Sequence, residues 1–113
     1  MATNGEDNYS TSQATRDEKA RITLREQGKR DATEFGYVGG IVGSLQDLRS
    51  RGYGEAAIMA YLDGVSTVMA ESVLGGQGIS PASLGYGDKL AQMKDLSTQF
   101  ILQSEQIATP TEK

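Results

Sequence analysis

The chain contains no cysteine, no histidine and no tryptophan. It therefore offers no disulfide, no thiolate nucleophile, no zinc-binding cluster and no imidazole to move protons near neutral pH. The glycine loops that hold nucleotide phosphates, G-x-x-x-x-G-K-S/T and G-x-G-x-x-G, are missing too, and so is an aspartate-rich calcium loop. The carboxylates fall mostly outside the apolar stripes of the predicted helices. We expect a protein with no enzymatic activity, cofactor, metal ion or small-molecule substrate.

Long apolar runs are scarce as well. The best candidate, FGYVGGIVG at positions 35–43, is far shorter than the roughly 20 residues that span a bilayer as a helix. The first 30 residues hold no apolar core of the kind found in secretory signals. The lack of cysteine fits a reducing compartment. These features predict a cytoplasmic protein with no transmembrane segment.

Proline occurs only twice, and no useful stretch alternates polar and apolar residues as a half-buried strand would. Apolar residues recur instead every three or four positions. This pattern predicts an all-α protein of three to four amphipathic helices, extended or hairpin-like rather than folded around a large compact core, with disordered polar termini. The predicted organisation is a flexible polar arm at 1–14, a single helical domain at 15–107 and a flexible tail at 108–113.

The helix boundaries can be placed from capping residues. Thr15 and Glu18 have the form of a capping box, which predicts a first helix starting near position 16. Further helices are expected at 34–51, 55–76 and 89–107. Gly52 should end the second helix and Gly75-Gly76 the third. The sequence Gly-Tyr-Gly occurs twice where helices should break, and we interpret both copies as turns.

The helix at 55–76 carries the clearest apolar stripe. Seven of its side chains are expected to pack against neighbouring helices: Ile58, Tyr61, Leu62, Val65, Val68, Met69 and Val73. In the last helix, Leu90, Met93, Phe100 and Ile101 should face one way, with Leu96 at the edge. We interpret the methionine and tyrosine side chains of the helix at 55–76 as core residues.

Glycine is abundant, with 14 residues. Two G-x-x-x-G spacings fall in the second predicted helix and involve Gly36, Gly39, Gly40 and Gly43. Small residues four apart let two helix backbones approach closely, so these glycines predict a tight helix–helix seam. The alternative is a helix broken by a loop at 39–40.

Charge is distributed unevenly along a chain with a formal net charge of −4. Residues 16–30 hold six basic and three acidic residues, whereas residues 52–113 hold three basic and seven acidic ones. A basic end and an acidic body favour head-to-tail association. The basic side chains are Arg16, Lys19, Arg21, Arg25, Lys29 and Arg30. The alternative is a pair of solvated helix faces. Nucleic-acid binding is a lesser alternative, because acids interrupt the basic stripe and no aromatic residue accompanies it.

Several short motifs occur in order in the second half of the chain. They are Asp63-Gly64-Val65, Val73-Leu74-Gly75, Pro81-Ala82, Gly85, and a last helix containing Gln92, Gln99, Gln103 and Gln106. In this order the segment 63–106 resembles the small R-body (refractile body) structural proteins of bacteria. The resemblance implies a non-enzymatic bacterial protein that polymerises with itself, or with a related subunit, into ribbons. Such ribbons coil in the cell and extend on a trigger, acid in some members, to rupture membranes.

These observations favour a self-assembling structural subunit of a protein polymer. The alternative is a small acidic adaptor or inhibitor, phage-encoded or virion-associated, that binds one host protein. If acid triggers a change, carboxylates must sense it, since histidine is absent. Packed acidic faces have raised pKa values. Asp63, Glu71 and Glu105 are the candidates for this acid switch.

Overall fold

The computed structural model describes residues 4–35 and 38–108, with side chains from residue 18 onward. This part of the chain folds into four helices and no strands, which confirms the all-α class. The helices are α1 (Asn4–Phe35), α2 (Val38–Ser50), α3 (Glu55–Gly76) and α4 (Tyr86–Ala108). The radius of gyration is 17.2 Å. A compact chain of this length would have a value of about 13 Å, so the molecule is extended.

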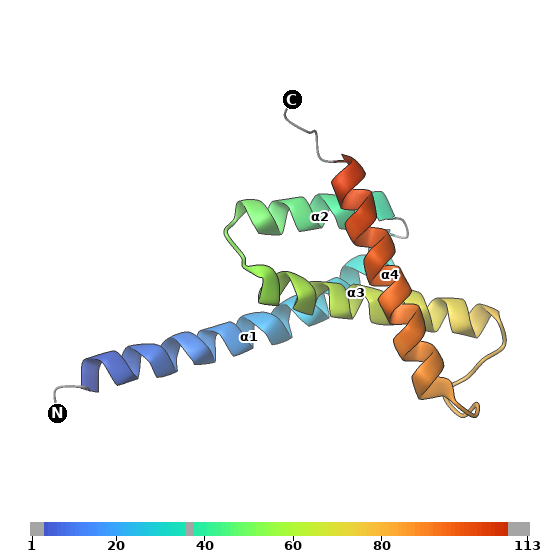
Figure 1. The fold of residues 1–113 in the computed structure, drawn as a ribbon, viewed down its shortest axis with the longest axis horizontal. Coiled ribbons are helices and arrows are strands. Elements are labelled where there is room, and N and C mark those ends of the chain that lie inside the picture. Colours follow the sequence, from blue (N-terminus) through green and yellow to red (C-terminus); the bar gives the residue numbers. More distant parts are fainter. Residues whose placement is uncertain (1–3, 36–37, 109–113) are drawn as a thin grey trace.

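Helix α3 lies at the centre of the arrangement (Figure 1). The longest interface joins α1 to α3, and α4 packs across α3 from the other side. Helix α2 packs mainly on α4 and makes few contacts with α1 or α3. The amino-terminal part of α1 extends beyond the other helices as an arm (Figure 1).

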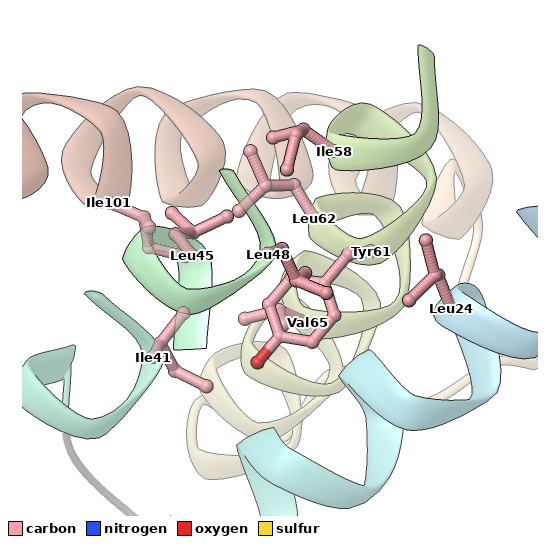
Figure 2. Packing of buried hydrophobic residues seen from close by; sticks show 9 residues of the cluster. All are labelled: Leu24, Ile41, Leu45, Leu48, Ile58, Tyr61, Leu62, Val65 and Ile101. Atoms are coloured by element: carbon pink, nitrogen blue, oxygen red, sulfur yellow. The ribbon is translucent and has the colours of Figure 1, made fainter. Parts of the chain in front are cut away.

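The core forms where the four helices meet (Figure 2). Tyr61, Leu62 and Val65 of α3 are almost completely buried there. Leu24 reaches the core from α1, and Ile101 from α4. Side chains of α2, namely Ile41, Leu45 and Leu48, complete the cluster. Four of the seven predicted packing residues of α3, those from Ile58 to Val65, therefore lie in this core.

The other three predicted packing residues of α3 lie nearer the surface. Val68 and Met69 are partly buried and line a shallow apolar groove with Val38 and Ile41 of α2. Val73 lines the same groove but is 41% exposed. The apolar stripe continues past the region that α1 and α2 cover, so its last turns are only partly packed.

Two helices end in the same backbone motif. After α2, Gly52 has a φ of +93°, and the Tyr53 amide donates to the carbonyl oxygen of Leu48. After α3, Gly78 has a φ of +80°, and the Ile79 amide donates to the carbonyl oxygen of Leu74. Both are Schellman motifs, in which a left-handed glycine reverses the chain. The prediction that Gly52 ends the second helix is confirmed. Helix α3 instead continues through Gly76, and Gly78 rather than Gly75-Gly76 is the glycine that reverses the chain after it.

The first Gly-Tyr-Gly segment is a turn, as predicted, whereas the second contributes only its first glycine to a turn and enters α4 with its other two residues. The first contains the left-handed Gly52, and the second begins with Gly85, whose φ is +74°. Helix α4 then starts at Tyr86, slightly before the predicted start. A left-handed residue at each site requires glycine, because a β-carbon there would clash with the backbone.

Helix α1 is longer at both ends than the sequence predicted. It begins at Asn4 rather than near position 16, so the helix is already formed where the capping box was expected to start it. It also continues to Phe35, and residues 36–37, which connect it to α2, lie outside the described residues. The tail at 109–113 lies outside them as well.

One helix in the described part of the chain, α3, is long and apolar enough to cross a membrane. Half of its most apolar stretch is buried inside the protein. The central helix of a folded core needs the same composition, because neighbours cover several of its faces. Its position in the bundle therefore accounts for its hydropathy.

Candidate protein-interaction surface

Three large apolar side chains lie on the outer face of α4. Leu96, Phe100 and Ile107 are 57%, 53% and 86% exposed. Their spacings of four and seven residues place them on one side of a helix with 3.6 residues per turn. We call these three residues the α4 stripe. Large apolar side chains gathered on one exposed face are typical of a surface that contacts another molecule.

Glutamines border the α4 stripe along one side. Gln92, Gln99, Gln103 and Gln106 are all exposed and occupy adjacent positions on the helix surface. Amide side chains can donate and accept hydrogen bonds without carrying charge. These four side chains add polar but uncharged groups beside the stripe, near the exposed charges of Lys89 and Asp95.

The opposite face of α4 fixes the helix to the body. Ile101 is fully buried in the core. Arg49 of α2 donates to both carboxylate oxygens of Glu105, through Nε at 2.9 Å and Nη2 at 3.1 Å. This bidentate pair raises the pKa of Arg49 against the opposing effect of burial. Because this side of α4 is held inward, the α4 stripe must face outward.

A second polar junction ties α4 to α1 through α3. The Asp63 carboxylate accepts from Arg25 Nε at 2.8 Å and from Lys94 Nζ at 2.6 Å. Partial burial raises the pKa of Asp63, but the hydrogen bonds and charges of Lys94 and Arg25 outweigh burial and hold that pKa below its ordinary value. The pair of cations therefore keeps Asp63 ionised well into acid.

A third polar junction lies between α1, α2 and α3. The Tyr61 hydroxyl donates to Asp31 Oδ2 at 2.6 Å, and the Ser44 hydroxyl donates to the same oxygen at 3.4 Å. Burial raises the pKa of Tyr61 above its ordinary value, and the hydrogen bond to Asp31 adds to this effect. In Figure 2 the Tyr61 hydroxyl points out of the apolar cluster. The hydrogen bond to Asp31 therefore satisfies the one polar group of a tyrosine whose ring lies in the apolar core.

The closest backbone approach lies between α1 and α3. A β-carbon on Gly28 would overlap the carbonyl oxygen of Tyr61, and one on Gly64 would overlap the carbonyl oxygen of Arg25. Neither glycine belongs to the predicted seam. Gly28 and Gly64 are the residues that let these two helices touch, because any side chain would hold the backbones apart.

The glycines of the predicted seam have other surroundings. Gly39 and Gly43 are exposed, and a β-carbon on Gly43 would meet nothing. The atoms nearest to a β-carbon on Gly40 would be those of the Phe35 side chain. Gly36 lies outside the described residues. Within the described part of the chain, Gly40 and Gly43 do not bring two helix backbones together, and contact with a second chain at this face stays a prediction.

Several basic side chains of α1 are paired within the chain. Arg21 contacts Glu18, and Lys29 lies 3.7 Å from Glu26. Arg25 is bound by Asp63. The remaining predicted contact residues are Lys19 and Arg30, which are exposed, and Arg16, whose side chain is not among those described. Intramolecular pairing reduces the positive charge that this face offers to a partner.

The three candidates for an acid switch lie apart from one another. Asp63 and Glu105 are each bound by basic side chains, whereas Glu71 is exposed. The proposed switch required acidic faces packed together with raised pKa values. For Asp63 that expectation is wrong, since two cations lower its pKa. Among the described residues no three acidic side chains gather closely enough to hold a metal ion.

Sequence reasoning missed two of these features. It placed Phe100 on the inner face of α4, although Leu96, Phe100 and Ile107 follow a helical repeat of their own. It also overlooked Asp31, which follows Leu24 and Gly28 at the spacing of a buried helix face.

Comparison of the chain with protein-family models, curated proteins and solved structures finds no match.

Proposed function

We propose that this protein is a non-enzymatic structural subunit that assembles with further copies of itself through the α4 stripe. The observation that carries the proposal is the exposure of Leu96, Phe100 and Ile107 on one face of a helix that is anchored by its other face. Taking one such side chain from full exposure to full burial contributes about 1.5–3 kcal/mol. These three are between half and fully exposed, so covering them would gain part of that amount for each and favour association.

A second copy of the chain is a suitable partner for this surface. Two α4 helices packed in opposite directions would each present the same stripe, as in a two-fold symmetric contact. The glutamine border adds no like charges to such a contact, and its amides can pair with one another. A partner recognised by charge would instead favour an acidic or basic border.

A dimer contact alone does not produce a polymer. The amino-terminal part of α1 projects beyond the other helices (Figure 1), and a second contact made there would let assembly continue without closing. The resemblance to R-body proteins, which includes the glutamine-bearing α4, supports ribbon formation as the outcome. A related subunit that shares these surfaces would join the same assembly.

The test is a comparison of wild-type protein with Phe100→Glu by light scattering, sedimentation and electron microscopy over a wide range of concentrations. Wild type should form dimers or larger assemblies, and Phe100→Glu should shift the population strongly toward monomer. Ala56→Glu adds the same charge at an exposed position of α3 and is the matched control. It should assemble like wild type.

Some results would contradict this proposal. A wild-type protein that stays monomeric at every concentration would overturn self-assembly and leave the adaptor that binds one host protein. Assembly that survives Phe100→Glu, with circular dichroism showing an intact fold, would mean that another surface makes the contact. Steep salt dependence of binding to nucleic acid would favour the third alternative.

A further inference from the structure

A small polar cavity of about 150 Å³ lies between α1 and α2, with α3 contributing Tyr61. Asp31 lines this cavity and is only 8% exposed. Two apolar side chains, Leu24 and Leu48, form part of its wall and are buried. Asp47, Arg51 and Tyr53 are exposed and lie toward solvent. The cavity thus combines a buried carboxylate with apolar walls and an open rim.

The charges in this cavity do not balance. Asp47 and Arg51 form an ion pair at 3.0 Å and neutralise each other. Asp31 receives hydrogen bonds from two hydroxyls, but among the described residues no lysine or arginine lies within ion-pair distance of it. A buried carboxylate without a cation loses hydration that hydroxyls replace only in part.

The hydrogen bonds also leave one side of the carboxylate available. Tyr61 and Ser44 both donate to Oδ2 of Asp31. Oδ1 receives a hydrogen bond from neither hydroxyl. A cation that entered from the rim could therefore bind Oδ1 while the Tyr61 and Ser44 hydroxyls hold the carboxylate in place.

We propose that this cavity binds an alkylammonium group, with Asp31 as its counter-ion. The ammonium would donate to Oδ1, and its alkyl chain would lie against Leu24 and Leu48. Tyr53 at the rim adds an aromatic ring, which attracts cations. A bare metal ion fits less well, because hard cations require several oxygen ligands and gain nothing from apolar walls.

The size of the cavity limits the ligand. A water molecule occupies about 30 Å³ of liquid, so the cavity corresponds to roughly five waters. That volume suits a four-carbon alkylammonium, which is also the end of a lysine side chain. The ligand is therefore either a free short amine or a lysine side chain presented by another chain.

The proposal is tested by titrating n-butylammonium chloride into the full-length protein and following amide shifts by NMR. Saturable shifts should centre on residues around Asp31, Ser44 and Tyr61. 1-Butanol, which has the same chain length without the charge, should produce none. Nα-acetyl-lysine methylamide distinguishes the two sources: tighter binding than butylammonium indicates a lysine side chain, and weaker binding a free amine.

Two variants complete the test. Asp31→Asn keeps the shape and still accepts from Tyr61, but it should weaken butylammonium binding at least about tenfold, as expected for the loss of a charge-assisted hydrogen bond. Asp88→Asn removes an exposed carboxylate on α4 and should bind like wild type. If Asp31→Asn does not fold, Gln27→Trp provides the second variant, since it fills the exposed rim and leaves Asp31 in place. No saturable shift in wild type, or equal binding by a folded Asp31→Asn or Gln27→Trp, would overturn the proposal.

Discussion

Gly28 of α1 and Gly64 of α3 face each other where the two helices cross, and each occupies the point at which a side chain would enter the backbone of the other helix. The atoms in the way are main-chain atoms, which cannot turn aside as a flexible side chain can. This contact therefore sets the distance between α1 and α3, which share the most extensive helix–helix interface of the fold.

Replacement of Gly64 by alanine should destabilise the protein by about 1–3 kcal/mol or more, because the added methyl group forces α1 and α3 apart. The gain in helix propensity, about 1 kcal/mol, is too small to offset this strain. Urea unfolding followed by circular dichroism measures the effect.

Gly43→Ala is the matched control, since Gly43 is also inside a helix but has open space around it. There the alanine should stabilise the protein by up to about 1 kcal/mol. If Gly64→Ala stabilised the protein as Gly43→Ala should, the crossing would not be as close as described.

Tyr61→Phe tests the polar junction between α1, α2 and α3. The substitution keeps the ring in the core but removes the hydroxyl that donates to Asp31 at 2.6 Å. The loss should be about 1–3 kcal/mol in the free energy of unfolding, since a buried carboxylate loses its shorter hydrogen bond. Tyr53→Phe, at a 38% exposed tyrosine, should change stability by less than about 0.5 kcal/mol.

The pair between Arg49 and Glu105 should contribute more than an ordinary surface ion pair. The Glu105 side chain is only 10% exposed, so Arg49→Ala removes a bidentate partner from a nearly buried carboxylate. We expect a loss of about 1–3 kcal/mol, measured by chemical unfolding. Arg51→Ala breaks an exposed pair with Asp47 and should cost less than about 1 kcal/mol.

A double-mutant cycle separates this pair from other effects of removing the arginine. In a Glu105→Gln background, Arg49→Ala should cost clearly less than it does in wild type. Equal costs in the two backgrounds would mean that Arg49 stabilises the protein through its other contact, with Glu55.

The lowered pKa of Asp63 predicts how the stability of the folded protein changes with acid. Its pKa in the folded protein lies below its ordinary value of 3.8. The unfolded chain therefore binds a proton more readily, and the stability that Asp63 contributes above pH 3.8 is lost as pH falls through the lower, folded pKa. Its contribution should be constant from neutral pH to mild acid and decline only in strong acid.

Asp63→Asn checks this assignment. The variant should be less stable than wild type at neutral pH, and the difference should shrink in strong acid. A difference that instead disappeared between neutral pH and mild acid would point to a raised pKa and restore Asp63 as an acid switch.

The sequence allowed the bundle to be predicted where local chemistry decides the outcome. The range of α3 agrees with the predicted one, although Gly78 rather than Gly75-Gly76 reverses the chain after it, and Gly52 was assigned correctly from its place at a helix end. Such features depend on neighbours in the chain. The seam at Gly28 and Gly64 could not be predicted in this way, because it depends on which helix each glycine meets.

The candidate surface was predicted less well for a related reason. Phe100 and Ile101 are adjacent in sequence, and both are apolar, yet one is half exposed and the other is fully buried. The contacts of α4 with other helices, Glu105 with Arg49 of α2 and Lys94 with Asp63 of α3, help decide which side of α4 faces inward. Apolar content alone does not distinguish a core face from a surface that awaits a partner.

The packing of α1 against α3 rather than α2 has a consequence for how the chain folds. Helices α1 and α2 make few contacts with each other, so a stable hairpin of these two helices should not form early. Gly28 and Gly64 can meet only after the segment 29–63 between them has formed a loop. Closing this loop costs conformational entropy before the contacts between α1 and α3 can stabilise it. Folding should therefore be slower than in a bundle whose successive helices pack together, with a rate set by topology rather than by helix propensity.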